Sequence, residues 1–235
     1  MRRALAFLTP LPVGTVEPPD RRALAWFPVV GALIGTALGG VWWGAERVWP
    51  VPVAAGLVVA ADLALTGMLH LDGLMDSADG LLPHLTRERR LAVMRQPDVG
   101  AYGVAVAVVV IGLRFATLAS IQPSVLLLAG IWCASRTTMA VISGALPYVR
   151  EEGLASRVVG NAWRPIGLYG LIASVSLGAF AGGRLREAAV ASVFAGALVV
   201  ALVARRRIGG FTGDILGAAG VIGETVALVV AAAKW

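Results

Sequence analysis

Long apolar runs dominate this 235-residue chain and leave it few ways to fold. The runs lie at about 23–45, 51–71, 100–121, 124–146, 165–183, 187–204 and 214–233. Most are close to the roughly 20 residues of helix that cross about 30 Å of hydrocarbon. Only 14% of the residues are charged and 58% are hydrophobic, which leaves little sequence for a separate soluble domain. The sequence therefore predicts one all-α domain over residues 1–235, a polytopic integral membrane bundle of about seven transmembrane helices.

Basic residues are distributed unevenly over the segments between these runs. If the N-terminus is cytoplasmic, 14 arginines fall on the inside and four basic residues on the outside. An excess of Lys and Arg is typical of short cytoplasmic loops. The distribution predicts a cytoplasmic N-terminus, and it also places two segments rich in Gly and Asp, at about 70–100 and 205–217, on the cytoplasmic side. We therefore expect the functional site at that face of the membrane.

An acidic segment closes the second apolar run. Asp72, Asp76 and Asp79 stand at positions i, i+4 and i+7, so a helix that continues through this segment carries all three on one face. Like charges placed in this way repel one another, and a divalent cation between them relieves the repulsion. Mg²⁺ suits oxygen ligands that it shares with a substrate phosphate. The spacing predicts a magnesium site, and the structural alternative is a helix end whose solvated acids serve as caps.

Several arginines follow the acidic segment, namely Arg87, Arg89, Arg90 and Arg95. Carboxylate-bound Mg²⁺ beside arginines is the recurring equipment of phosphoryl transfer, which favours a membrane-embedded phosphotransferase. The alternative is that these arginines serve only membrane topology and contact with anionic lipid. The chain has no P-loop motif and no H-E-x-x-H motif, which disfavours a P-loop nucleotidase and a zincin.

A second acidic patch lies near the C-terminus, where a glycine-rich segment over residues 209–220 contains Asp214. Glycines here allow either close approach to a ligand or close packing of helices. Ionisable residues also stand inside predicted spans: Asp62, Arg114, Arg136 and Glu224. Each costs about 3 kcal/mol at the bilayer centre, so such groups face the bundle interior or a wet cavity. Mutual pairing of these acids and arginines is the structural alternative to a role in a site.

Several segments together carry a resemblance to a known family. They are Phe7-Leu8-Thr9-Pro10-Leu11-Pro12-Val13, Phe27-Pro28-Val29-Val30-Gly31, His70-Leu71-Asp72-Gly73 through Asp76 and Asp79-Gly80, Met94-Arg95 with Gly100-Ala101-Tyr102-Gly103, Ser135-Arg136, Pro147-Tyr148-Val149-Arg150 with Glu152-Gly153-Leu154, and Thr212-Gly213-Asp214 through Gly217-Ala218 with Glu224. Seven such pieces in order and at plausible spacing are specific. The chain resembles the cobalamin synthase family, adenosylcobinamide-GDP ribazoletransferase, over nearly its whole length.

This resemblance implies a multi-pass enzyme of the bacterial or archaeal cytoplasmic (inner) membrane, with its active site facing the cytoplasm and Mg²⁺ as cofactor. The implied reaction joins adenosylcobinamide-GDP to α-ribazole, or to its 5′-phosphate, and releases GMP in the last step of nucleotide-loop assembly. The implied partners are these small-molecule substrates and membrane lipid, without nucleic acid. The question of a homo-oligomer stays open.

The resemblance also implies roles for individual residues. The expected catalytic residues are Asp72, Asp76, Asp79, Asp214 and Arg95. The expected metal ligands are Asp72, Asp76, Asp79, Asp214 and Glu224. The expected substrate-binding residues are His70, Arg136, Arg150, Gly73, Gly80 and Gly213. The family usually has Lys where this chain has Arg95, so a role that needs a compact ammonium is in doubt there, whereas a phosphate contact is not.

Two other classes are weighed against this interpretation. A CDP-alcohol phosphotransferase has an Asp-rich signature that Asp76, Asp79 and Gly80 begin, but Pro83-His84 stands where Ala-Arg belongs and no Asp pair follows at the required spacing. A secondary transporter tends to place coupled acids at the midplane within repeats, whereas these carboxylates collect at one face and no repeat is visible.

Overall fold

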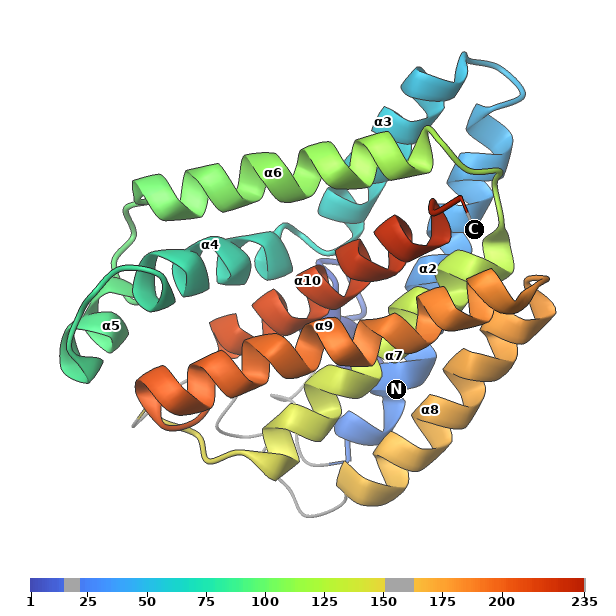
Figure 1. Cartoon of the computed structure of the whole chain (residues 1–235). Coiled ribbons are helices and arrows are strands. Elements are labelled where there is room, and N and C mark those ends of the chain that lie inside the picture. The colour runs from blue at the N-terminus through green and yellow to red at the C-terminus, as the bar shows by residue number, and fades with distance from the viewer. Residues whose placement is uncertain (15–21, 151–162, 235) are drawn as a thin grey trace.

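The structure is a computed structural model that describes residues 1–14, 22–150 and 163–234. Within these ranges the regular elements are helices, joined by one isolated β-bridge between Tyr148 and Phe211, which confirms the all-α fold class. The elements are α1 (Arg2–Leu8), η1 (Leu24–Trp26), α2 (Phe27–Ala45), α3 (Val51–Leu65), α4 (Leu69–Leu81), α5 (Arg87–Val93), α6 (Ala101–Leu118), α7 (Val125–Ala145), α8 (Trp163–Phe180), α9 (Arg184–Ile208) and α10 (Gly213–Ala231). Figure 1 shows their arrangement.

Five helical stretches are long and apolar enough to cross a membrane, and they are Leu24–Ala45, α6, α7, α9 and α10. The bent pair of α3 and α4 makes a sixth if it is taken as one span. The helix α8 overlaps the predicted run at 165–183 but is not among these stretches. The protein is therefore a polytopic helical membrane protein, and the number of seven spans stays a prediction.

The acidic segment is helical as expected, but the second apolar run is bent before it and is not one continuous helix. The helices α3 and α4 meet at 87°, across a break of a few residues (Figure 1). Gly67 and Met68 both have left-handed backbone angles there, with φ of 58° and 59°. A right-handed helix cannot pass through two such residues, and Gly accepts this conformation without steric cost. The aspartates consequently lie on a helix of their own.

Local signals explain where several helices begin and end. Pro28 and Pro52 stand in the first turns of α2 and α3, where no backbone donor is lost. The side chain of Thr212 accepts a hydrogen bond from the Ile215 amide at the start of α10. The helix α9 ends at Gly209, which has the left-handed conformation common after a helix.

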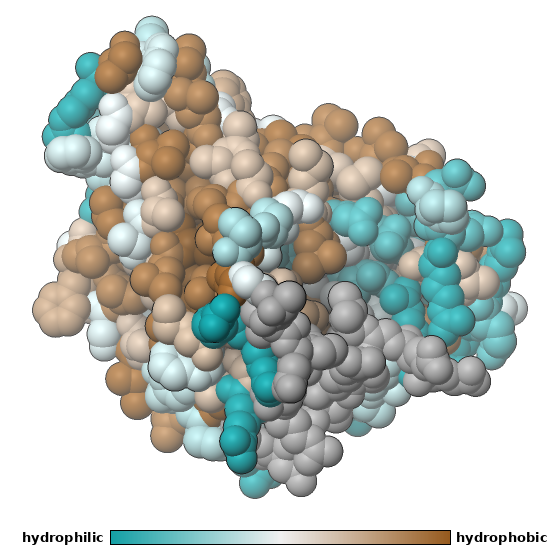
Figure 2. Space-filling view, turned by 180° about the vertical axis from the view of Figure 1, so that it is seen from behind, coloured by the Kyte–Doolittle hydropathy of each residue, from teal (hydrophilic) through white to brown (hydrophobic). Residues whose placement is uncertain are grey.

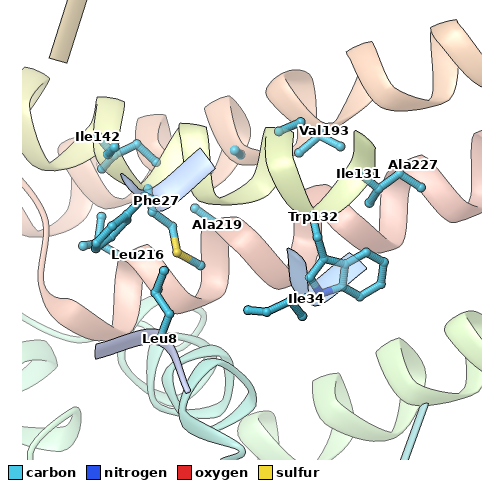
Figure 3. Close-up of a cluster of buried hydrophobic side chains, with 14 of the residues drawn as sticks. Leu8, Phe27, Ile34, Ile131, Trp132, Ile142, Val193, Leu216, Ala219 and Ala227 are labelled. Carbon is cyan, nitrogen blue, oxygen red and sulfur yellow. The ribbon is translucent and has the colours of Figure 1, made fainter. Parts of the chain in front are cut away.

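Close helix packing forms the core of the bundle. The helix α10 packs against α9, α4, α7 and α6, while α2 packs along α7. A Cβ atom at Gly31 or Gly35 of α2 would come within 2.3 Å or 2.2 Å of a carbonyl oxygen of α7, so these positions admit only glycine. Figure 3 shows apolar side chains of this core, among them Leu8, Phe27, Trp132 and Leu216, gathered between the helices.

Polar and apolar residues separate on the surface. In Figure 2 the hydrophilic residues gather mainly at the right, which is the end of the molecule where α5 lies in Figure 1. Apolar residues cover much of the rest of this view. The C-terminal end of α9 with Arg205, Arg206 and Arg207 belongs to the same end as the start of α10, because only residues 209–212 separate the two helices.

Candidate active site

A cavity of about 180 Å³ lies where α4, the start of α10 and the segment after α7 meet. Its polar lining consists of His70, Asp72, Arg150 and Asp214. Its apolar lining consists of Phe7, Phe27, Leu69, Met139, Tyr148 and Leu216. Residues from the N-terminal helix and from the C-terminal span therefore share one cavity.

Two glycines let α4 and α10 touch at this cavity. A Cβ atom at Gly73 would lie 2.9 Å from the carbonyl oxygen of Asp214, and one at Gly217 would lie 3.2 Å from the Cα atom of His70. Side chains at these positions would push the helices apart and separate Asp72 from Asp214. Gly73, predicted to bind substrate, thus has a packing role, while Gly213 does line the cavity at the first residue of α10.

An ion pair joins the two halves of the polar lining. Arg150 donates through Nη2 to Asp214 Oδ2 at 2.5 Å and to the Met94 carbonyl oxygen at 2.9 Å. The Thr212 hydroxyl donates to the same Asp214 oxygen at 3.2 Å. These contacts orient the Asp214 carboxylate and leave its Oδ1 without a hydrogen bond among the described residues.

The segment before Arg150 is held in place by backbone hydrogen bonds. The Val149 amide donates to the Phe211 carbonyl at 3.1 Å, and the Phe211 amide donates to the Pro147 carbonyl at 2.9 Å. The pKa of the Tyr148 phenol is raised, because burial and the negative charge of Asp214 outweigh the positive charges of Arg150 and Arg95. Arg95, a predicted catalytic residue, is exposed and does not line the cavity.

Asp76 lies one turn after Asp72 on α4 and is half-buried, whereas Asp72 is exposed to the cavity. Asp76 is close enough to Asp72 and Asp214 for their negative charges to disfavour ionisation of its own carboxyl group. Within residues 1–14, 22–150 and 163–234, no group of three or more His, Cys, Asp or Glu side chains could hold a metal ion by itself. Mg²⁺ is commonly held by one or two carboxylates together with substrate phosphates, and Asp72 and Asp214, which line one cavity, fit that kind of site, with Asp76 one turn further along α4.

Asp79 has a different environment from the other two aspartates of α4. Its Oδ2 accepts from the Gly100 amide at 2.7 Å, and its Oδ1 accepts from the Gly103 amide at 2.9 Å. The first amides of a helix have no partners within the helix, and a carboxylate at this position satisfies them. Asp79 therefore caps α6, which agrees with the alternative that the acids serve as helix caps. These contacts give no support to its predicted catalytic and metal-binding roles.

Asp79→Asn is expected to lower the free energy of unfolding by about 1–2 kcal/mol, because the amide keeps only one of the two acceptors at the start of α6. Denaturant unfolding in detergent measures this change. Asp98→Asn is the matched control, since Asp98 is exposed, and it should change stability by less than about 0.5 kcal/mol. Lost activity at unchanged stability would instead return Asp79 to the catalytic group.

Other arginines near the acidic segment bind helix ends. Arg90 donates to the carbonyl oxygens of Gly80 and Leu81 at 2.8 Å, and Arg87 donates to the Ile208 carbonyl at 2.8 Å. Arg207 also donates to the Leu81 carbonyl. The last carbonyls of α4 and α9 need such donors, so the arginines are explained without a phosphate. Gly80 faces Met94, whose Cγ would lie 2.4 Å from an added Cβ, and it too has a packing role.

The ionisable residues inside the spans form one buried network. Arg114 pairs with Asp62 and Glu224, each at 2.6 Å, and Arg136 pairs with Glu224 at 2.6 Å. Ser135 donates to Glu224 at 2.7 Å, and Trp132 donates to Asp62 at 3.0 Å. The interpretation that these acids and arginines pair with one another is confirmed. Both Glu224 oxygens are engaged, and Glu224 does not line the 180 Å³ cavity, so the structure does not bring this predicted metal ligand to the site.

His70 connects this network to the cavity. Its Nδ1 lies 3.5 Å from Arg136 Nη2, and its ring lines the cavity. A guanidinium only donates, so Nδ1 is the acceptor in this contact. Arg136 is 1% exposed and does not line the cavity. Its contacts with Glu224 and His70 explain its position without a direct contact to substrate.

The sequence interpretation missed the apolar lining. Phe7, Phe27 and Tyr148 all belong to segments that carry the family resemblance, and this was the only signal that could have indicated them. The resembling residues Glu152-Gly153-Leu154 lie outside the described residues.

Fold and site together define a class: a polytopic helical membrane protein whose carboxylates and arginine meet in one cavity, an arrangement suited to phosphoryl transfer. Comparison with known proteins identifies the family. A family model described as cobalamin-5-phosphate synthase matches residues 1–232, and the chain belongs to this family.

Curated relatives extend over nearly the same length. Proteins called adenosylcobinamide-GDP ribazoletransferase are 38% identical in Bradyrhizobium diazoefficiens (99% of this chain and 93% of the relative), 36% in Roseiflexus sp. (96% and 86%) and 31% in Escherichia coli O17:K52:H18 (96% and 96%). No solved structure matches the chain. The resemblance found in the sequence is thus confirmed.

Proposed function

We propose that this protein joins adenosylcobinamide-GDP to α-ribazole, or to its 5′-phosphate, and releases GMP, the last step of nucleotide-loop assembly. Membership of the cobalamin-5-phosphate synthase family and the names of the relatives support the activity. The observation that carries the assignment of the site is the convergence of Asp72, Asp214 and Arg150 on one cavity, which no single helix could produce.

The reaction exchanges one phosphorus–oxygen bond for another. A hydroxyl oxygen of the ribazole ribose attacks the phosphorus that carries the corrinoid, and the bond from this phosphorus to the bridging oxygen breaks. GMP leaves with that oxygen and its electron pair. The hydroxyl proton passes to a carboxylate of the cavity, and Arg150 neutralises negative charge on the diphosphate.

Mg²⁺ is part of the proposal, with Asp72, Asp76 and Asp214 as its protein ligands. A bound Mg²⁺ would neutralise the diphosphate oxygens and favour departure of GMP. One of these carboxylates holds the attacking hydroxyl and accepts its proton. Thr212 and Arg150 hold the Asp214 carboxylate in a fixed orientation before substrate binds.

The proposed location is the bacterial or archaeal cytoplasmic membrane, with the cavity open toward the cytoplasm and lipid around the apolar helices. The ratio of 14 inside arginines to four outside basic residues supports this orientation. The hydrophilic end seen in Figure 2 supports it as well.

Purified protein in proteoliposomes should release GMP only when adenosylcobinamide-GDP, α-ribazole and Mg²⁺ are all present. Excess EDTA should lower the rate by at least about tenfold, because the diphosphate charge is then uncompensated. GMP is quantified by chromatography. Release of CMP from a CDP-alcohol, or solute flux without chemistry, would contradict the proposal, and GMP release that persists in EDTA would contradict the magnesium site alone.

A further inference from the structure

The lining of the active-site cavity contains an aromatic surface that phosphoryl transfer does not use. Phe7 and Phe27 stack with ring centroids 5.7 Å apart, and Tyr148 packs edge-on against Phe211 at 5.3 Å. Phe27 and Phe211 are fully buried, which leaves Phe7 and Tyr148 as the half-buried faces of two supported pairs. Rigid aromatic faces of this kind bind flat apolar groups at low entropic cost.

The position of Phe7 depends on the N-terminal helix. Ala4 and Leu8 of α1 are completely buried and belong to the main hydrophobic core. Arg2 is hydrogen-bonded to the Val13 carbonyl, which ties the beginning of this segment to its end. The helix α1 is therefore docked, and Phe7 is a fixed part of the cavity lining.

The size of the cavity limits what it can hold. A cavity of about 150 Å³ accepts benzene, whereas pockets that enclose a whole drug-sized ligand measure about 300–1,000 Å³. At about 180 Å³ the cavity has room for one flat ring system and not for a corrin macrocycle. The substrates of the proposed reaction carry three flat bases: the guanine and the adenine of the donor, and the benzimidazole of α-ribazole.

Polarity distinguishes the benzimidazole from the two purines, because adenine, like guanine, carries N–H donors and ring acceptors. Guanine carries a carbonyl oxygen and N–H donors that need partners when they are buried. The dimethylbenzimidazole of α-ribazole has no N–H group, and its methyl groups prefer an apolar surface. Phe7, Phe27, Leu69 and Leu216 offer no hydrogen-bonding side chain, and Met139 offers only a weak sulfur acceptor. Tyr148 adds one hydroxyl, which cannot satisfy all the donors and acceptors of a purine. Of the four polar residues of the cavity, the proposed function assigns Asp72, Asp214 and Arg150 to the diphosphate, the metal and the attacking hydroxyl, and His70 contacts Arg136.

We infer that the apolar lining binds the benzimidazole of the acceptor α-ribazole, with Phe7 as its principal contact. The inference rests on the proposed function and adds which substrate the cavity receives. The benzimidazole lies against Phe7 and Tyr148, so that the ribose hydroxyl is directed to Asp72 and Asp214. The corrinoid and both purines of the donor stay outside the cavity.

The test is the substitution Phe7→Ala, with the KM measured separately for each substrate. The KM for α-ribazole should rise about tenfold, the expected result of losing one aromatic face. The KM for adenosylcobinamide-GDP should stay within about twofold, since the donor does not touch this surface. Phe180→Ala is the matched control, because Phe180 is 79% exposed at the far end of α8, and it should leave both constants unchanged.

A second variant and a binding measurement make the result independent of turnover. Leu69→Trp fills the cavity instead of opening it. This variant should also raise the KM for α-ribazole and leave the KM for the donor unchanged. Calorimetric titration of α-ribazole into wild-type protein and Phe7→Ala, without donor, should show the same tenfold loss of affinity. A rise in the donor KM, or no change in either constant, would overturn the inference, as would wild-type protein that does not bind α-ribazole. Absence of GMP release alongside intact α-ribazole binding would instead refute the proposed function.

Discussion

Asp72→Asn and Asp76→Asn are each expected to lower the rate of GMP release by about 10²–10⁴-fold, the range for groups that act directly on the reacting atoms. The substitution keeps the shape of the side chain and removes its charge, so it removes the ability to hold Mg²⁺ or to accept a proton. Asp72 lines the cavity, and Asp76 lies within the influence of the Asp72 and Asp214 charges. Rates are measured in proteoliposomes that contain equal amounts of protein.

The matched control for these two variants is Asp98→Asn, which removes an exposed aspartate that does not line the cavity. It should retain wild-type turnover. All three variants should elute as folded protein in detergent, because neither Asp72 nor Asp76 is fully buried. Wild-type turnover in both Asp72→Asn and Asp76→Asn would eliminate the carboxylate site as the centre of the reaction.

Glu224→Gln should reduce the free energy of unfolding by about 3–5 kcal/mol, the usual cost of removing one partner from a buried ion pair. Glu224 is 1% exposed and compensates the charges of both Arg114 and Arg136. Without its charge, two buried guanidinium groups share only Asp62, in an interior that solvates ions poorly. Denaturant unfolding in detergent, with and without Mg²⁺, gives the measurement.

Glu187→Gln serves as the comparison for this prediction, because Glu187 is exposed in the first turn of α9 and should change stability by less than about 0.5 kcal/mol. A Glu224→Gln variant of normal stability whose activity requires much more Mg²⁺ would show the opposite of what the network indicates. It would make Glu224 a metal ligand, as the sequence interpretation expected.

The fold class could be predicted from the sequence because the hydrophobicity of a span is a local property. Each apolar run records its need for lipid regardless of what the rest of the chain does. Most of the predicted runs correspond to helices, from α2 at the first run to α10 at the last. The exception is the second run, where Gly67 and Met68 turn the chain sharply. A left-handed Met leaves no mark in a hydropathy profile.

The site could be predicted only in part. Spacing on α4 indicated Asp72 and Asp76, and the glycine-rich segment indicated Asp214. The same spacing included Asp79, whose carboxylate turns to the amides of Gly100 and Gly103. Periodicity specifies the face of a helix on which a residue lies, and it does not specify which neighbour satisfies the side chain.

The sequence by itself determined that this chain is a helical membrane protein with an acidic cluster, because charge and hydropathy are read one segment at a time. The tertiary structure alone decided which acids share the cavity and which are used elsewhere. Gly73 and Gly217 bring α4 against α10, and the contacts of residues 147–149 with Phe211 bring Arg150 to Asp214. These contacts join residues far apart in the chain. For that reason the three aspartates that the spacing placed on one face of a helix differ in the folded protein: Asp72 shares a cavity with Asp214 of α10, and Asp79 caps α6.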